Sequence, residues 1–338
     1  MRVALDAMGG DHGPRAVVPA AARALADFPD LSITLVGQSG VLEDAVRGYD
    51  ILAGERCRIV AAPDVVAMHD KPSTALRMKR DSSMRRAIDL VRAGEADAAV
   101  SAGNTGALMA IARFVLKMQP GIDRPAICAA MPGSARHTHM LDLGANVDAE
   151  PEVLTQFAVM GTVLSAAMEG RAQPAIGLLN IGEEEIKGGD RLRRAAELIQ
   201  EAGLNYAGFV EGNDIFKSKV DVIVCDGFSG NVALKASEGT AQMITGAMRE
   251  EFMRSALTRA AGLVARPILK RLRVRFDPRH YNGASLLGLR GIVVKSHGSA
   301  DEKAFANALH VAVAEIENNV PGRISALLER QLVTRHAI

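Results

Sequence analysis

Short runs of Val, Ile and Leu recur along the chain, and most of them end at or next to Gly, Asp, Asn or Ser. The runs cover residues 3–6, 33–37, 58–61, 98–101, 126–130, 140–143, 176–180, 222–226 and 292–295. Unbroken apolarity, in place of strict alternation, is typical of strands that are buried on both faces of a sheet. The runs therefore predict a sheet that helices cover on both sides.

Segments with helical patterning separate these runs, at 14–28, 73–92, 105–118, 151–168, 190–202, 231–251 and 301–319. Strands that alternate with helices predict an α/β fold, a three-layer α/β/α sandwich with a mainly parallel sheet. A length of 338 residues leaves room for two domains. Because no linker or internal repeat divides the chain, we expect residues 1–338 to form a single unit of two intertwined α/β lobes.

The segment 249–279 departs from this pattern because it is strongly basic. It holds nine basic residues, Arg249, Arg254, Arg259, Arg266, Lys270, Arg271, Arg273, Arg275 and Arg279, and three acidic ones. Apolar residues recur in it at intervals of three or four, at Met253, Leu257, Ala260, Val264 and Ile268. Pro267 is expected to kink or divide the helix. We expect a basic amphipathic helical hairpin that protrudes from the sheet.

Composition excludes several classes of function. A net charge of +1, only 4% aromatic residues and no Trp argue against a nucleic-acid partner. Cys57, Cys128 and Cys225 are too few and too widely spaced for a disulfide framework or a metal motif. They suit a reducing cytoplasm. No uncharged apolar run approaches the roughly 20 residues that span a bilayer, so any membrane contact is expected to be peripheral.

Six predicted strand ends are polar and rich in glycine. They are residues 6–11 (DAMGGD), 101–106 (SAGNTG), 142–146 (DLGAN), 180–183 (NIGE), 226–231 (DGFSGN) and 295–301 (KSHGSAD). For any one loop, turn formation and helix capping are sufficient explanations. Ligands of open α/β sheets bind beyond the carboxyl ends of the strands, where N–H groups near helix N-termini bind anions. Six such loops at one edge of the sheet therefore predict an anion site.

Familiar catalytic motifs are absent. There is no GxGxxG after a strand, no GxxxxGK[ST] and no HExxH. The residues around Ser229 lack GxSxG spacing, so we expect Ser229 to be a turn or binding residue and not a nucleophile. The run Glu183–Glu184–Glu185 is expected to be solvated, and no metal site is predicted.

Two residues remain open from the residue pattern alone. Lys187 follows a strand and the three glutamates and precedes two glycines, so it can reach a phosphate or an oxyanion. A surface lysine paired with those glutamates fits equally well. His297 can bind phosphate or shuttle a proton, and a capping or core role fits it as well.

These loops, taken in order, closely resemble the bacterial acyl-ACP:phosphate acyltransferase family. The matching stretches are ALDAMGGDHGP (4–14), KPSTALRMKRDSSM (71–84), SAGNTGALMA (101–110), DRPAI (123–127), LDLGANVD (141–148), GLLNIGEEEIKG (177–188), GFVEGNDIF (208–216), DGFSGNVALKASEG (226–239) and GLRGIVVKSHGSAD (288–301). The resemblance implies the fold shared by phosphotransacetylases and the isopropylmalate dehydrogenase group. It also implies a cytoplasmic homodimer that needs no cofactor and supplies acyl phosphate to a membrane glycerol-3-phosphate acyltransferase, for phosphatidic acid synthesis.

The resemblance carries catalytic roles onto Lys187 and Asn231. For substrate binding we expect residues of the polar loops, namely Asp6, Gly9, Gly10, Asn104, Thr105, Asn146, Gly182, Ser229, Gly230 and His297. The family's membrane-contact region falls in the hairpin at 250–276. The hairpin's arginines also suit docking of acidic acyl carrier protein, and a helix pair packed in the dimer is the third interpretation.

The implied chemistry needs no catalytic triad. Phosphate is already an anionic nucleophile, and a thioester expels a thiolate whose conjugate acid has a pKa of roughly 8–9. The enzyme must position two anionic reactants and stabilise an oxyanion. Direct attack by phosphate is therefore our hypothesis. The rival functions are a decarboxylating NAD-dependent dehydrogenase, a short-chain phosphotransacetylase and a noncatalytic scaffold.

Overall fold

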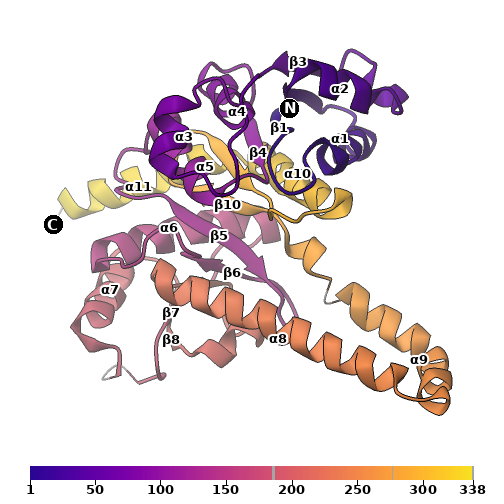
Figure 1. Ribbon diagram of the computed structural model, residues 1–338. Coiled ribbons are helices and arrows are strands. Elements are labelled where there is room, and N and C mark those ends of the chain that lie inside the picture. The colour runs from indigo at the N-terminus through magenta and orange to yellow at the C-terminus, as the bar shows by residue number, and fades with distance from the viewer. Residues whose placement is uncertain (185–186, 276, 337–338) are drawn as a thin grey trace.

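The structure, a computed structural model, describes residues 1–184, 187–275 and 277–336. Within these ranges one 11-stranded sheet has helices on both faces, as Figure 1 shows. The strands are β1 Arg2–Asp6, β2 Ser32–Gly37, β3 Cys57–Ala61, β4 Ala98–Ser101, β5 Ala126–Met131, β6 Thr138–Leu141, β7 Ile176–Leu179, β8 Tyr206–Val210, β9 Val222–Val224, β10 Ala284–Leu287 and β11 Ile292–Lys295. The predicted three-layer α/β sandwich is confirmed.

The strands form two parallel groups that run in opposite directions. Their order is β3-β2-β1-β4-β11-β10-β5-β6-β9-β7-β8. Strands β1 to β4 and β11 are mutually parallel, and so are β6, β9, β7 and β8. The antiparallel pairs β11–β10, β10–β5 and β5–β6 join the groups and reverse the direction. The carboxyl ends of the two groups therefore lie at opposite edges, and the expectation of six loops at one edge is wrong.

We call the group around β1 and β4 lobe 1, and the group around β6 and β9 lobe 2. The main helices are α1 Pro14–Asp27, α2 Ser39–Val46, α3 Pro72–Met78, α4 Ser83–Arg92, α5 Thr105–Leu116, α6 Pro151–Glu169, α7 Gly189–Glu201, α8 Gly227–Met253, α9 Ala256–Arg275, α10 Glu302–Glu317 and α11 Val320–His336. Single-turn 3-10 helices lie at Asp50–Leu52, Gly212–Phe216 and Pro278–Tyr281.

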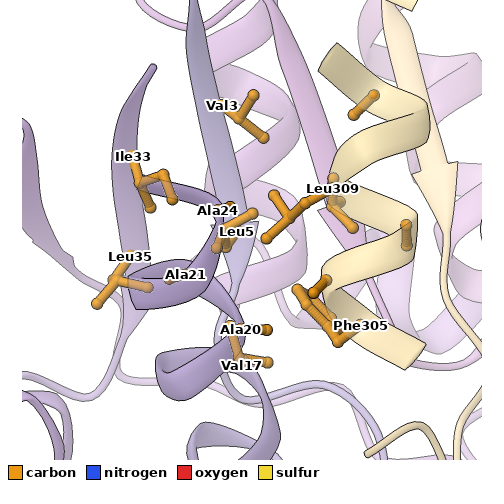
Figure 2. Close-up of a cluster of buried hydrophobic side chains, with 14 of the residues drawn as sticks. Val3, Leu5, Val17, Ala20, Ala21, Ala24, Ile33, Leu35, Phe305 and Leu309 are labelled. Carbon is orange, nitrogen blue, oxygen red and sulfur yellow. The ribbon is translucent and has the colours of Figure 1, made fainter. Parts of the chain in front are cut away.

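Small side chains let α1 pack closely on the lobe 1 sheet. Figure 2 shows Ala20, Ala21 and Ala24 of α1 near Leu5 of β1, with Phe305 and Leu309 of α10 in the same buried cluster. Helices α4 and α5 cover the other face of lobe 1, and α6, α7 and α11 pack on lobe 2. Each fully buried Leu or Phe stabilises the fold by roughly 1.5–3 kcal/mol.

The predicted helix at 73–92 is wrong in one respect, because two helices occupy it. Helix α3 ends at Met78, and Ser82 caps α4 by accepting a hydrogen bond from the Arg85 N–H at 3.3 Å. The strands β8 and β10 and the helices α2 and α11 were not predicted. All nine predicted strands are present.

Helices α8 and α9 form a hairpin that protrudes from the body (Figure 1). It begins earlier than the predicted bounds of 249–279, because the predicted helix at 231–251 is its first arm. Pro267 lies inside α9, which is continuous through it, so of the two expected effects, a kink or a division, the helix shows no division. The helical run breaks at Arg254 and Ser255, and the Ser255 side chain accepts from the Thr258 N–H at 3.1 Å. The side chains of Arg273 and Arg275 lie outside the described part. Among the described residues, no helix has both the length and the apolarity to cross a membrane.

Candidate active site

Asp6 ends β1 with its carboxylate buried beneath the lobe 1 loops. Its Oδ2 accepts a hydrogen bond from the Ser101 hydroxyl at 2.6 Å, and the Gly103 N–H donates to the same hydroxyl at 3.0 Å. Burial raises the pKa of Asp6, and the Ser101 hydrogen bond opposes that rise. Asp6 thus ties the loop after β1 to the loop after β4 and sits below them.

Glycines allow the lobe 1 loops to touch. A Cβ on Gly9 would lie 2.5 Å from Asp6 Oδ2 and 2.8 Å from the Gly103 nitrogen. Gly10 has φ +84°, and a Cβ there would lie 2.8 Å from the Gly298 oxygen. Close backbone approach therefore requires both glycines, and their role in binding stays a prediction.

Asn104 caps α5, and its amide is fully engaged in the loop. The side-chain oxygen accepts from the Ala107 N–H at 2.9 Å, while Nδ2 donates to the Met68 and Asp70 carbonyls at 2.7 and 3.1 Å. This matches the capping explanation. Thr105, the first residue of the helix, is exposed beside it.

His297 lies exposed on the loop after β11. Its imidazole Nδ1 is 2.9 Å from the Ser299 hydroxyl, and its main-chain N–H donates to Asn282 Oδ1 at 2.8 Å. The Asp11 N–H donates to the Gly298 carbonyl at 2.8 Å. The structure thus brings the loops that carry Asp6, Gly10, Asn104 and His297 together at one edge of lobe 1.

The lobe 2 loops are organised by Asp142, a residue that the sequence did not single out. Its fully buried carboxylate accepts from the N–H groups of Ile127 at 3.0 Å, Ala145 at 3.0 Å and Asn146 at 2.6 Å. Asn146 Nδ2 donates to the same carboxylate at 2.9 Å and to the Pro125 carbonyl at 2.8 Å. The Asn146 donors therefore bind the protein itself, which favours a structural role.

The start of α8 is fitted tightly onto the Asp142 loop. A Cβ on Gly230 would lie 1.9 Å from the Asp142 carbonyl oxygen. Asp226 caps α8 by accepting from the Ser229 N–H at 2.8 Å, and Arg191 pairs with Asp226 at 2.9 Å. Asn231, the next residue on the helix, is exposed, and its amide has no hydrogen-bond partner in the described ranges.

Lys187 lies in an ion pair between β7 and α7, two residues before α7 begins. Its Nζ is 2.8 Å from Glu184 Oε2, and hydrogen bonding to Glu184 raises the pKa of Lys187. The pairing is the one that a surface lysine was expected to make. A Cβ on Gly182 would lie 2.4 Å from Lys187 Cδ, so Gly182 leaves room for the side chain. Glu185 lies outside the described residues.

The sequence also missed Lys295, the last residue of β11. It is 8% exposed, and its ammonium donates to the carbonyls of Ser296 and Ala102, the latter at 3.3 Å. The only signal in the sequence is a cation that ends an otherwise apolar strand. Lys295 lies within electrostatic range of Lys235, two turns into α8. Asn231 lies one turn before Lys235 on α8, against the Gly144 backbone of the lobe 2 loop.

None of the three cysteine thiols is activated as a nucleophile. Burial raises the pKa of Cys57 to about 11 and also raises the pKa values of Cys128 and Cys225, so their thiols are poor nucleophiles. Within the described ranges, no three His, Cys, Asp or Glu residues are grouped to hold a metal ion.

Comparison with known sequences gives close matches over nearly the whole chain. A family model described as a fatty acid synthesis protein matches residues 1–323. A phosphate acyltransferase from Methylococcus capsulatus is 62% identical over 322 residues, which are 95% of each chain. Phosphate acyltransferases from Alkalilimnicola ehrlichii and Pseudomonas putida are 57% and 54% identical, and the matches cover 98% of each of those chains.

Solved structures with low identity share the fold. A phosphotransacetylase from Streptococcus pyogenes superposes with a TM-score of 0.65 at 17% identity, over 94% of both chains. A 4-hydroxythreonine-4-phosphate dehydrogenase from Klebsiella pneumoniae gives a TM-score of 0.53 at 12% identity, over 94% of this chain and 98% of its own.

Proposed function

Because this chain belongs to the phosphate acyltransferase family, we propose that it moves a long-chain fatty acyl group from acyl carrier protein to inorganic phosphate. The product is an acyl phosphate, which a membrane glycerol-3-phosphate acyltransferase consumes in phospholipid synthesis. The single observation that carries the proposal is 62% identity to a phosphate acyltransferase over 95% of both chains.

In the proposed reaction, a phosphate oxygen attacks the thioester carbonyl directly. The carbon–oxygen bond forms, the carbon–sulfur bond breaks, and the thiolate leaves with the electron pair of that bond. Asn231 donates a hydrogen bond to the developing oxyanion, a role that its uncommitted amide and its exposure permit. Lys187 leaves Glu184 and neutralises phosphate or oxyanion charge. The raised pKa values of the three thiols support direct attack over an acyl-cysteine intermediate.

The proposed partners are acyl carrier protein, the membrane surface and a second copy of this chain. The arginines of the hairpin suit acidic acyl carrier protein, and its exposed apolar stripe suits the inner face of the cell membrane. We also propose a homodimer. No cofactor and no nucleic acid are needed.

One assay tests the activity. The protein is mixed with palmitoyl acyl carrier protein and phosphate, and hydroxylamine traps the acyl phosphate as a hydroxamate. We expect phosphate-dependent hydroxamate formation and slow turnover of acetyl-CoA. Faster turnover of acetyl-CoA would identify a short-chain phosphotransacetylase. If neither donor gives a hydroxamate, the result would favour the noncatalytic scaffold. An acyl group that stays covalently attached to the denatured protein would contradict direct attack.

A further inference from the structure

Lys295 is a buried cation without a carboxylate in contact. Its side chain joins the residues that follow β4 and β11, because its ammonium donates to the Ala102 carbonyl at 3.3 Å and to the Ser296 carbonyl. No carboxylate of the described residues lies within 4.0 Å of it. An ammonium has three N–H donors, and the described hydrogen bonds use two of them.

An ammonium buried without a counter-ion destabilises a fold. Proteins keep such a group where it meets a ligand or takes part in chemistry. Burial lowers the pKa of Lys295 to about 8, and the negative charges of Asp6 and Asp11 oppose this effect. The protein therefore holds a lysine whose charge is poorly compensated until an anion arrives.

The surroundings of Lys295 suit an anion. Ala102, which accepts from the ammonium, lies three residues before the first residue of α5, and the positive end of that helix dipole favours negative charge. Gly10 and Gly298 keep side chains off the adjoining backbone. Thr105 and Ser299, both exposed, lie on the same loops and supply hydroxyl donors.

A second cation, on α8, acts on the charge of Lys295. Lys235 lies on α8 one turn after Asn231, and its positive charge lowers the pKa of Lys295 further. Lys235 is exposed and pairs only with Glu238 of its own helix, at 2.8 Å, among the described residues. Two like charges across the junction of the lobes repel each other, and an anion between them relieves the repulsion.

We infer that Lys295 is a phosphate-binding residue, which holds inorganic phosphate at the lobe 1 edge opposite Lys235 and the start of α8. This inference rests on the proposed function for its substrate, and it adds a binding residue to Lys187 and Asn231. Lys295 binds the nucleophile, while Asn231 serves the carbonyl that the nucleophile attacks.

The test compares Lys295→Met with Arg58→Met, which removes the same charge from an exposed ion pair with Glu95 in lobe 1. In Lys295→Met we expect the KM for phosphate to rise by roughly ten- to a hundredfold, as expected for losing a hydrogen bond to a charged group. The KM for the acyl donor should stay unchanged, and Arg58→Met should match the wild type. An unchanged KM for phosphate, or an equal rise in the KM for the donor, would overturn the inference.

Thermal unfolding separates this role from a structural one. Replacing a buried unpaired ammonium with an apolar group of similar length should leave Tm unchanged or raise it. A lower Tm for Lys295→Met, together with normal phosphate binding by Lys295→Ala, would show that the lysine serves the fold alone.

Direct binding distinguishes this inference from the proposed function. Calorimetry with inorganic phosphate and no acyl donor should show binding to the wild type and much weaker binding to Lys295→Met, even if no acyl phosphate forms. In the wild type, phosphate affinity should fall as pH rises above about 8, because Lys295 loses its proton there. Lys295→Arg keeps its charge and should remove that fall. The same fall in Lys295→Arg would contradict the assignment.

Discussion

At the scale of single residues, Asp142 shows how one carboxylate orders a site that it does not form. Four N–H donors from three residues converge on it, and Gly230 of α8 rests against its carbonyl oxygen. The position of Asn231 therefore depends on Asp142. The site needs a carboxylate at residue 142, because every group that hydrogen-bonds to this side chain is a donor.

We predict that Asp142→Asn destabilises the protein by about 2–4 kcal/mol, because the new amide turns its own N–H groups toward buried donors. Urea unfolding measures the change. Asp148→Asn, on the exposed part of the same loop, is the control and should change stability by less than about 0.5 kcal/mol. Equal effects of the two substitutions would refute the role of Asp142.

The proposed catalytic residues make a second prediction at this scale. Lys187→Met and Asn231→Ala should each lower kcat by about 10²–10³, the usual loss for one oxyanion donor. Both side chains are at least partly exposed, so unfolding should be unaffected. Lys117→Met, on an exposed lysine after α5, is the matched control. Full turnover in correctly folded Lys187→Met and Asn231→Ala would exclude both roles.

The sequence predicted single residues less well than elements. Asn104 and Asn146 were expected to bind substrate, yet their amide donors bind main-chain carbonyls and, for Asn146, the Asp142 carboxylate. Lys295 was missed, because only the fold brings its ammonium to the Ala102 carbonyl. Partners far apart in the chain decide these outcomes, and a residue pattern does not contain them.

At the scale of elements, every strand that the apolar runs predicted is present in the structure. The two missed strands lack that signal. Strand β10 has four residues, one of them Ser285, and β8 at the sheet edge contains Gly208. The apolar runs also did not predict which neighbouring strands pair in parallel and which pair antiparallel. An apolar run reads the same whether its neighbours run with it or against it.

Glu315 couples α10 to β10 and gives a pH-dependent prediction. It is 2% exposed and hydrogen bonded to the Ser285 hydroxyl, and burial raises its pKa from 4.5 to about 7. The folded state therefore holds a proton that the unfolded state releases. The resulting stability is fully present below pH 4.5 and is lost as pH rises to about 7.

We predict that Glu315→Gln is more stable than the wild type by about 3 kcal/mol at about pH 8, and nearly equal to it at about pH 4.5. Urea unfolding at both pH values measures the difference. Glu317 lies two residues further along α10 and is exposed, so Glu317→Gln should have the stability of the wild type at both pH values. A stability gain that does not change with pH would show that Glu315 is not the titrating group.

The hairpin gives the fourth prediction. Leu257 and Val264 of α9 are 80% and 82% exposed, although apolar. Leu257→Glu with Val264→Glu should release the protein from vesicles of anionic lipid, as measured by flotation. Thr240→Glu with Gln242→Glu adds the same charge elsewhere on the hairpin and should reduce binding less. Dissociation of a dimer by the first pair, without loss of vesicle binding, would instead favour helix packing between subunits.

At the scale of the whole molecule, the two lobes are not consecutive in the chain. Lobe 1 takes β1 to β4 from the first third and β11 and α10 from the last, and the strands of lobe 2 lie between them in sequence, with α11 added to lobe 2 from the end of the chain. The two parts of lobe 1 share one buried cluster, in which α1 and α10 meet (Figure 2). Lobe 1 is therefore built from the two ends of the chain within one sheet.

That arrangement bears on how the protein emerges from the ribosome. Strand β4 leaves the exit tunnel with one edge bare, and its neighbour β11 is translated only after every strand of lobe 2. A bare strand edge invites pairing with other nascent chains. The strands of lobe 2 are therefore all available before the lobe 1 sheet can be completed, although α11 joins the lobe 2 core only at the end of synthesis. The lobe 1 sheet thus stays open at β4 until β11 has been made.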